Sequence, residues 1–315
     1  MPSSYLIPRD HCPACRSTER TTLFACGYLD SPIREHLVTL YEPQGTIELE
    51  YLEGGEFILF RCGSCGLAYQ GHAPNAALME RLYEHWVDPE RAVALREAGL
   101  SLDDRLGYVR EVLLALQLPR PTPRLRAFDF GMGWGHWCLM AQALGCEVSG
   151  AERSPSRVAN ARAHGIKIVD WDEIPAQQFD LINCDQVLEH LEEPLDTLQH
   201  VAKALAPQGL LKVSVPDCGD LARRLARGDW LAPDGSPDTL LVVSPLQHIN
   251  GFDHGSLVAM AARAGLRPAR PALGKLYASS VERFTPGGLL AGLTRPLGRR
   301  FVTRDTYMFF ERAGA

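Results

Sequence analysis

Three glycines at alternate positions, Gly131, Gly133 and Gly135, constrain the fold of this chain more than any other feature. They directly follow a strand-like apolar segment, 126–130, and precede a segment with helical spacing, 137–144. A strand that passes into a helix through such a turn is typical of the first unit of a parallel α/β sheet. Glycine suits the turn because it has no Cβ, tolerates positive φ and lets a ligand approach the backbone. The turn therefore predicts a ligand site at the carboxyl end of the first strand.

Strand-like and helical segments continue to alternate after the turn. The expected strands are 147–152, 166–169, 179–184, 210–215 and 306–310, and the expected helices are 155–164, 194–205 and 251–265. Strands that alternate with helices of this length form a mostly parallel sheet with helices on both faces. We therefore expect an α/β domain of the doubly wound type over residues 121–315.

The spacing of the glycines separates two classes of cofactor site. A dinucleotide fingerprint has the spacing G-x-G-x-x-G, whereas the third glycine here comes one residue early and His136 stands in its place. This spacing argues against a nicotinamide oxidoreductase. An acid, Asp129, precedes the glycines, and the sequence D-x-G-x-G-x-G resembles the first motif of class I methyltransferases that use S-adenosylmethionine (SAM). A tight structural turn is the alternative explanation.

The same resemblance continues downstream. The block 179–194, with F-D-L-I followed by V-L-E-H and a proline, resembles a contiguous segment of this family. The stretches 210–217 and 247–266 resemble its later segments, so the resemblance covers about half of the chain. It implies a Rossmann-like sheet of seven strands, SAM as the cofactor, and methyl transfer to a small-molecule acceptor by in-line displacement.

The resemblance also implies which residues bind the cofactor. The glycine turn and the acid before it would surround SAM, and Glu152, which ends the next strand, would accept the ribose hydroxyls. Asp170 would bind the adenine amino group and Trp171 would pack on its ring. Asp185 and Gln186 would line the methionine end. An exposed strand-end acid at 152, and a shift of register around 170, are the alternatives that the sequence leaves open.

Two histidines are the candidate catalytic residues. The sulfonium of SAM is a good leaving group, so the enzyme must mainly align the acceptor, and it needs a base only where a proton must leave. His190 lies just past the fourth strand and His248 lies in the late segment. Imidazole titrates near neutral pH, so either could be the base. Each could instead only hold local structure.

Two cysteine pairs bracket the N-terminal region, Cys12-x-x-Cys15 and Cys62-x-x-Cys65. Each pair places two thiolates on one tight turn, and two such turns supply the four ligands of a closed tetrahedral zinc site. We expect a β-hairpin within 46–61 to bring the pairs together. A closed site leaves no open position on the metal, so zinc would be structural. Iron or unpaired thiols are the alternatives.

The chain is expected to have three parts: a small, β-rich zinc-ribbon-like domain at 1–74, a helical connector at 75–120, and the methyltransferase domain at 121–315. Three prolines between 119 and 123 mark the second boundary. This layout resembles bacterial enzymes of sugar and natural-product biosynthesis. The similar nucleotide-sugar C-methyltransferases generally carry a further large C-terminal domain, for which this chain has no room. This departure counts against a sugar acceptor, whereas the layout itself implies a small-molecule acceptor, either an anionic sugar nucleotide or another biosynthetic intermediate.

The charge pattern limits the partners. The net charge is −6, from 32 basic and 38 acidic side chains, and creates no general field that attracts nucleic acid, so we expect none to bind. No apolar run approaches the ~20 residues that span a bilayer, and the N-terminus lacks a secretion signal. We therefore expect a cytoplasmic protein without a membrane partner. Basic residues after position 260 form either a solvated surface or a rim for an anionic substrate: Arg263, Arg267, Arg270, Lys275, Arg283, Arg295, Arg299, Arg300, Arg304 and Arg312.

A second hypothesis keeps the fold without the reaction. The chain would then be a methyltransferase-like binding protein whose zinc domain docks a protein or RNA partner, with no methyl transfer. The complete motif series argues against this hypothesis, because a site that had lost its function need not keep glycines and acids in register.

Overall fold

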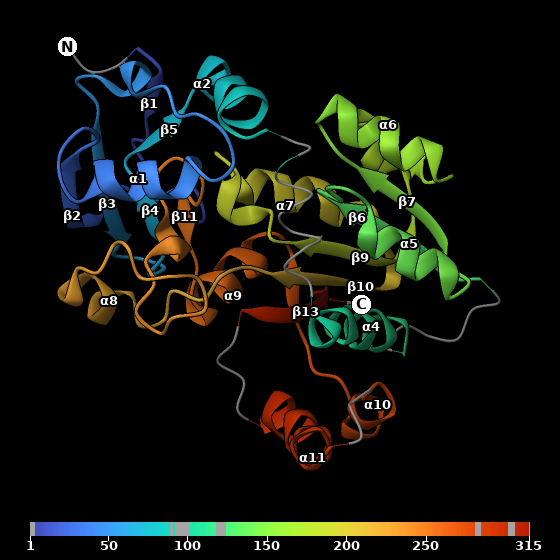
Figure 1. Ribbon diagram of the computed structural model, residues 1–315. Coiled ribbons are helices and arrows are strands. Elements are labelled where there is room, and N and C mark those ends of the chain that lie inside the picture. Colours follow the sequence, from blue (N-terminus) through green and yellow to red (C-terminus); the bar gives the residue numbers. More distant parts are fainter. Residues whose placement is uncertain are drawn as a thin grey trace. The chain divides into compact units, whose positions relative to one another are not determined.

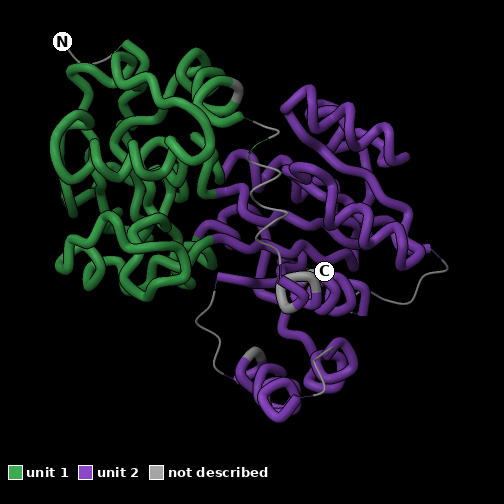
Figure 2. Tube along the Cα trace, viewed as in Figure 1, with its two compact units in different colours: residues 1–100, 189–194, 216–259 green, residues 101–188, 195–215, 260–315 purple. Residues whose placement is uncertain are grey.

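The structure, a computed structural model, describes residues 4–88, 91, 101–117, 124–280, 285–301 and 306–314 (Figure 1). The chain forms two compact units, shown in green and purple in Figure 2. Unit 1 comprises residues 1–100, 189–194 and 216–259, and unit 2 comprises residues 101–188, 195–215 and 260–315. The predicted boundary at 120 lies outside the described residues. Among the helices that are described, none has both the length and the apolar character needed to cross a membrane.

A seven-stranded sheet forms the centre of unit 2. Its strands are β6 (Arg126–Phe130), β7 (Glu147–Ala151), β8 (Lys167–Ile168), β9 (Phe179–Asp185), β10 (Leu205–Ser214), β12 (Leu266–Ala269) and β13 (Tyr307–Arg312). Their order is β12-β13-β10-β9-β6-β7-β8. The strands from β6 to β10 pair in parallel, and β13 pairs antiparallel with β10 and β12. The predicted α/β fold with a mostly parallel seven-stranded sheet is confirmed.

The order of these strands positions a ligand site. β6 lies between β7, the next strand along the chain, and β9, so the chain reverses its direction of travel across the sheet at β6. A crevice forms at the carboxyl ends of the strands at such a point. The glycine turn directly follows β6 and leads into α5 (His136–Ala143), which places the predicted motif at this crevice.

Helices α4 (Leu102–Gln117) and α5 share an apolar core with the sheet of unit 2. Apolar side chains recur at helical spacing on α4, which gives the helix one apolar face. The buried members of this core include Val112, Leu114, Ala127, Trp137, Ala141, Val148 and Leu181. Each large side chain buried in this way stabilises the fold by about 1.5–3 kcal/mol.

A four-stranded antiparallel sheet forms the base of unit 1. Its strands are β2 (Arg20–Gly27), β3 (Glu56–Cys62), β4 (Ala68–Gln70) and β11 (Asn250–Gly251), in the order β11-β4-β3-β2. The strands β1 (Leu6–Pro8) and β5 (His72–Pro74) form a separate antiparallel pair. A late segment of the chain therefore completes the N-terminal sheet.

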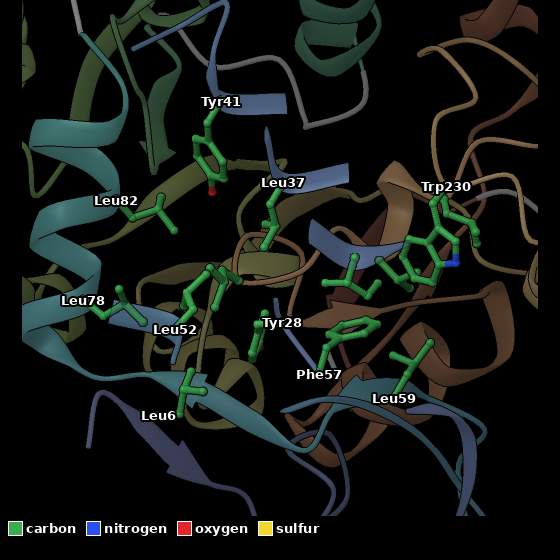
Figure 3. Close-up of a cluster of buried hydrophobic side chains, with 14 of the residues drawn as sticks. Leu6, Tyr28, Leu37, Tyr41, Leu52, Phe57, Leu59, Leu78, Leu82 and Trp230 are labelled. Carbon is green, nitrogen blue, oxygen red and sulfur yellow. The ribbon is translucent and has the colours of Figure 1, made fainter. Parts of the chain in front are cut away.

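The predicted hairpin within 46–61 is wrong in its first strand. Residues Leu49–Leu52 form a short 3-10 helix, and β3 pairs with β2 and β4 instead. Leu52 is fully buried among the apolar side chains of unit 1 shown in Figure 3. Packing of this side chain overrides the local apolar/polar alternation that predicted a strand.

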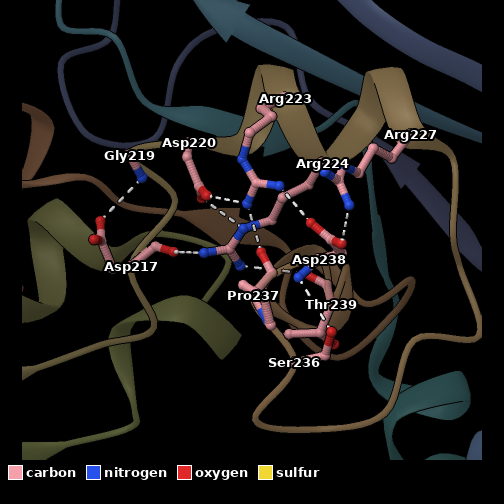
Figure 4. A network of polar contacts seen from close by, with 10 residues as sticks. All are labelled: Asp217, Gly219, Asp220, Arg223, Arg224, Arg227, Ser236, Pro237, Asp238 and Thr239. Atoms are coloured by element: carbon pink, nitrogen blue, oxygen red, sulfur yellow. Dashed lines mark hydrogen bonds and ion pairs between the residues drawn. The ribbon is translucent and has the colours of Figure 1, made fainter.

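The segment 222–244, which has no clear period in the sequence, packs into the same core. Trp230 lies edge-on to Phe57, with ring centroids 5.7 Å apart, and is labelled in Figure 3. Helix α8 (Leu221–Arg227) holds the following loop through a polar network, in which Arg223 and Arg227 both pair with Asp238 (Figure 4). Exposed ion pairs contribute only about 0–1 kcal/mol each, so the apolar contacts of Trp230 dominate the packing of this segment.

Candidate functional site

The glycine turn adopts the left-handed backbone that glycine permits. The angle φ is +74° at Gly131, +54° at Gly133 and +79° at Gly135. A Cβ atom at Gly131 would lie 2.5 Å from Val187, and one at Gly135 would lie 2.9 Å from Ile166. Among the described residues beyond its chain neighbours, no heavy atom lies within 4 Å of a Cβ built at Gly133. Gly133 is thus the position where a ligand can approach the backbone.

Glu152 lies directly after β7, and its side chain reaches the glycine turn. Its Oε2 accepts a hydrogen bond from the amide of Gly133 at 3.0 Å. Its Oε1 accepts from the amides of Arg153 and Ser154 at 2.8 and 2.9 Å, and the guanidinium of Arg157 lies 3.8 Å away. The structure therefore brings the predicted ribose ligand and the predicted glycine turn together and fixes the carboxylate with three N–H donors.

Asp129, the acid of the motif, is buried rather than exposed at the crevice. Its carboxylate accepts a hydrogen bond from Asn183 at 2.7 Å and lies 3.6 Å from the thiol of Cys138. Burial raises the pKa of Asp129 to about 7, although the hydrogen bond from Asn183 works in the opposite direction. The side chain thus braces β6 against β9 and α5. Sequence reasoning missed Asn183, although a polar residue inside a buried strand is an available signal.

Asp170 and Trp171 lie at the start of a 3-10 helix, Trp171–Ala176. Asp170 forms a capping box with Glu173, so its carboxylate already accepts a hydrogen bond from the backbone amide of Glu173. The ring of Trp171 is about half exposed, stacks on His200 with centroids 3.9 Å apart, and lies 6.2 Å from the ring of Phe130. Trp171 therefore offers an aromatic face near the end of β6, and His200 fixes its orientation.

Asp185, at the end of β9, pairs with a buried lysine that the sequence reasoning missed. Lys212 of β10 is almost completely buried, and its Nζ lies 2.9 Å from Asp185 Oδ1. It also pairs with Glu111 of α4 and lies 4.9 Å from the centre of the Tyr307 ring. Burial works against the ammonium charge, but Glu111, Tyr307 and Asp185 together raise the pKa of Lys212 above its ordinary value. The lysine therefore stays charged and orients Asp185.

Gln186 follows Asp185 in a left-handed conformation, with φ at +54°. This backbone is unfavourable for a residue with a Cβ and occurs where surrounding contacts enforce it. The amide of Gln186 donates to the carbonyl oxygen of Ser214 at 2.8 Å, which ties the end of β9 to the end of β10. Gln186 therefore lies at the carboxyl edge of the sheet, which is the edge where the cofactor site is predicted.

His190 and His248 come together in unit 1, and Glu189 joins them. One ligand atom of each of these three residues lies within 4.8 Å of the others. The imidazoles contact the carbonyl oxygens of Gln247 and Leu241 through Nδ1, at 2.9 and 2.6 Å. Because a carbonyl oxygen only accepts hydrogen bonds, both Nδ1 atoms carry the proton and both Nε2 atoms keep a lone pair. We call these three residues the Glu-His-His cluster.

The two histidines of the cluster are neutral. Burial, with His248 nearby, lowers the pKa of His190 to about 3, and burial also lowers the pKa of His248. The side chain of Glu189 is buried beside them, with Oε1 at 3.8 Å from His190 Nε2. Sequence reasoning singled out both histidines but not Glu189, although it directly precedes His190 in the chain.

Arg9, directly after β1, and Gln70, at the end of β4, hold the loops that carry this cluster. Arg9 is buried and donates to the carbonyl oxygen of Glu192 at 2.7 Å and to the side chain of Asn250 at 2.9 Å. Gln70 donates to the carbonyl oxygen of His248 at 3.1 Å. Arg9 lies close to Cys12 in the chain and Gln70 lies close to Cys65, so the cysteine region and the cluster loops share supporting contacts.

All four cysteines of the two predicted knuckles meet in unit 1. The sulfur atoms of Cys12 and Cys65 are 3.6 Å apart, those of Cys15 and Cys62 are 3.5 Å apart, and all four lie within 4.8 Å of one another. Zinc–sulfur bonds of about 2.3 Å in a tetrahedron place sulfur atoms about 3.8 Å apart, so the spacing fits a closed tetrahedral site. None of the four forms a disulfide. The pairing of β2 with β3, rather than the expected hairpin, brings the knuckles together.

Comparison with known proteins agrees with the site geometry. A family model described as a methyltransferase domain matches residues 102–269, which is more than half of the chain. The match includes the glycine turn, Glu152 and the Glu-His-His cluster. It confirms the resemblance expected from the sequence and supports SAM as the methyl donor.

Curated relatives share a lower level of similarity over part of their length. A ubiquinone biosynthesis O-methyltransferase from Bradyrhizobium diazoefficiens is 30% identical over 156 residues, which cover 45% of this chain and 61% of the relative. An enzyme of the same name from Cereibacter sphaeroides is 27% identical over 161 residues, covering 45% of this chain and 65% of the relative. The chain thus spans less than two thirds of the length of these relatives.

Solved structures show a distant likeness. One is a putative methyltransferase in complex with the Trm112 activator of Haloferax volcanii, with 18% identity, a TM-score of 0.42, and coverage of 71% of this chain and 95% of that one. Another is the plantazolicin methyltransferase BamL in complex with a triazolic desmethylPZN analog and SAH, with 13% identity, a TM-score of 0.45, and coverage of 74% of this chain and 92% of that one.

Proposed function

Because the chain belongs to the methyltransferase domain family over residues 102–269, we propose that it transfers a methyl group from SAM to a small-molecule acceptor. The observation that carries the proposal is the contact between Glu152 and Gly133, which places a fixed carboxylate beside the one open glycine of the turn. A backbone that a ligand can approach and an acid for ribose hydroxyls are the two requirements of a nucleoside site at this edge of the sheet.

The remaining cofactor contacts are proposed from the residues around this turn. SAM supplies an activated methyl group on a sulfonium, and the chain's own residues bind and orient it. Glu152 accepts hydrogen bonds from the ribose, and the exposed face of Trp171 packs on the adenine, with Asp170 beside it. Asp185, oriented by Lys212, and the strained Gln186 bind the amino and carboxylate groups of the methionine end. Asp129 acts from within the sheet, by holding the strand that carries the turn.

The acceptor is proposed to be a hydroxyl oxygen. The names of the relatives describe them as O-methyltransferases, which supports this choice. An anionic sugar nucleotide or another biosynthetic intermediate offers such a group. A hydroxyl must lose its proton during transfer, and the Glu-His-His cluster is proposed to serve this step.

Two roles are open to the cluster, and its geometry favours one. A general base works best with a pKa near the operating pH, whereas half-buried neutral imidazoles whose Nδ1–H groups are held by carbonyl oxygens are typical of metal-binding histidines. Two Nε2 atoms and a carboxylate are a donor set that a divalent cation accepts. A cation held by Glu189, His190 and His248 would supply a Lewis acid for the hydroxyl.

The four-cysteine site is proposed to hold zinc in a structural role. The sulfur spacing fits a tetrahedron, and four thiolates leave no open position for chemistry. Zinc there would fix the segments that carry Arg9 and Gln70, and through them the loops of the cluster.

Isothermal titration with SAM, SAH and NADH tests the proposed function on the full chain. We expect binding of SAM and SAH and none of NADH. Mass spectrometry after incubation with labelled SAM and a hydroxylated metabolite mixture then detects transfer. Binding of NADH alone would favour an oxidoreductase. Absence of SAM binding, together with a stable complex with a protein or RNA, would favour the non-catalytic binding protein.

A further inference from the structure

The described basic residues after position 260 have different roles. Arg267 pairs with Glu311 at 2.9 Å, and Arg312 donates to backbone carbonyl oxygens at the start of β10. These two side chains therefore support the edge of the sheet. Three arginines of the segment belong instead to α11 (Pro286–Phe301), whose sequence also contains four leucines and a phenylalanine.

Helix α11 presents an apolar face to solvent. Five of its large apolar side chains are between 42% and 69% exposed: Leu289, Leu290, Leu293, Leu297 and Phe301. With 3.6 residues per turn, these positions fall within an arc of about 120° around the helix. Soluble proteins rarely leave such a continuous stripe uncovered, so the face marks an interaction surface.

Hydrogen bonds hold the helix at its first turn and at a backbone carbonyl in its middle. Thr285 accepts a hydrogen bond from the amide of Gly288 at 3.1 Å and caps the first turn. The hydroxyl of Tyr277, on the neighbouring helix α10 (Leu273–Ala278), donates to the carbonyl oxygen of Leu293 at 3.0 Å. The exposed face is therefore part of a helix with its own local support.

The charge on α11 indicates the chemistry of the partner. The sixteen residues of the helix contain three arginines and no acidic residue. Arg295 lies about 240° around the helix from Leu289, on the side opposite the apolar arc, whereas Arg300 lies about 20° from Leu289, inside the arc, at the C-terminal end beside Phe301. An apolar face on a helix whose only charged residues are basic matches a layer of acyl chains below anionic headgroups.

We propose that α11 docks on an anionic lipid surface and lies in the plane of the interface. Sixteen residues give a helix of about 24 Å, too short to cross the hydrocarbon core of a bilayer but sufficient to lie within one leaflet. A second copy of the chain fits the face less well. In a symmetric contact between two such helices, neither helix would have an acidic residue that could pair with the arginines of the other.

Vesicle flotation with the full chain tests this proposal. The vesicles are phosphatidylcholine alone or phosphatidylcholine with phosphatidylglycerol in a 7:3 ratio, a composition of about one third anionic lipid of the kind that attracts basic helices. We expect binding to the anionic vesicles at least about tenfold above that to phosphatidylcholine, and we expect salt to weaken it. The double variant Leu293→Ser/Leu297→Ser should lower partitioning at least about tenfold, because two side chains lose their apolar burial.

The matched control is Leu231→Ser, which changes an equally exposed leucine in unit 1 and should bind as the parent does. Unchanged thermal unfolding of each variant shows that the fold is intact. The proposal is overturned if the parent chain binds neither vesicle, or if the double variant partitions like the parent. It is also overturned if light scattering shows a dimer that the double variant abolishes, since the face would then bind a second copy.

Discussion

The carboxylate of Glu152 accepts a hydrogen bond from the amide of Gly133 across 3.0 Å, which joins the end of β7 to the turn after β6. The other oxygen of the same carboxylate accepts from two further amides. Three N–H donors keep the side chain in one orientation before any ligand arrives. The side chain of Glu152 therefore loses little conformational freedom when a ribose binds to it, which favours affinity.

We expect Glu152→Ala to weaken SAM binding by about 10-fold to 100-fold, because hydrogen bonds to a charged group contribute about 1.5–3 kcal/mol. Glu152→Gln keeps one acceptor oxygen, so its affinity for SAM should lie between those of Glu152→Ala and the parent. Isothermal titration measures both. Glu147→Ala, at the exposed opposite end of β7, is the control and should bind SAM normally. Equal affinities for all four proteins would remove Glu152 from the site.

The buried carboxyl group of Asp129 should make stability depend on pH. Its pKa rises from 3.8 to about 7 on folding. Between these values the folded chain keeps a proton that the unfolded chain releases, so the free energy of unfolding should fall as pH rises from about 4 to about 7 and then stay level. Three pKa units correspond to about 4 kcal/mol at most.

Asp129→Asn removes this titration and keeps an oxygen that can accept from Asn183. We therefore expect the free energy of unfolding of the variant to exceed that of the parent at pH 8, and this difference to become much smaller at pH 4.5. Urea unfolding at the two pH values measures the difference, and the other titrating groups cancel in the comparison. A stability difference that is independent of pH would show that Asp129 is ionised in the folded chain at both values.

The glycine turn shows how much of the site local sequence can predict. The spacing of Gly131, Gly133 and Gly135 predicted a strand–turn–helix unit with positive φ, and the structure has it. This inference works because each step depends on neighbours in the chain. The register of Glu152 with the turn was equally accessible, since two consecutive parallel strands place their carboxyl ends side by side.

The missed residues depend on contacts between distant segments. Lys212 obtains its partners from α4 and from the end of β9, and neither pairing leaves a periodic signal. Arg9 binds loops that follow it by about two hundred residues, through carbonyl oxygens that any residue type could supply. The hairpin prediction failed for the related reason that the burial of Leu52 depends on the packed core, not on its neighbours.

The buried ammonium of Lys212 should depend on its two carboxylate partners more than they depend on it. Lys212→Met removes a buried charge and leaves two partly exposed carboxylates, which water can solvate, so we expect a loss of about 1–2 kcal/mol. The double variant Glu111→Gln/Asp185→Asn leaves the buried ammonium without either carboxylate and should cost about 3–5 kcal/mol. Urea unfolding compares the two. A larger loss for Lys212→Met would contradict this order.

The four-cysteine site should bind one zinc ion per chain. Cys65→Ser removes one ligand and should release the metal on gentle chelation, with a large fall in the melting temperature, because metal binding at such sites contributes directly to folding. Cys26→Ser changes a half-buried cysteine outside the site and should keep both the metal and the melting temperature. A colorimetric zinc assay and thermal unfolding measure the two quantities. Full zinc content in the Cys65 variant would rule out the proposed ligand set.

The Glu-His-His cluster should bind a divalent cation independently of the cysteine site. The protein is first stripped of metal with a chelator and then reloaded with one zinc ion per chain. Titration of this protein with Mn²⁺ should reveal one further site. His248→Ala should weaken the affinity of that site for Mn²⁺ by about 10-fold or more, because one of three protein ligands is lost. His164→Ala, an exposed histidine of unit 2, is the control and should leave the affinity unchanged.

Measurements of methylation activity then separate the two proposed roles of the cluster. If the cation assists transfer, chelation should abolish methylation in the parent chain and Mn²⁺ should restore it. If Mn²⁺ does not bind and methylation survives chelation but not His190→Ala or His248→Ala, the cluster acts as a base instead.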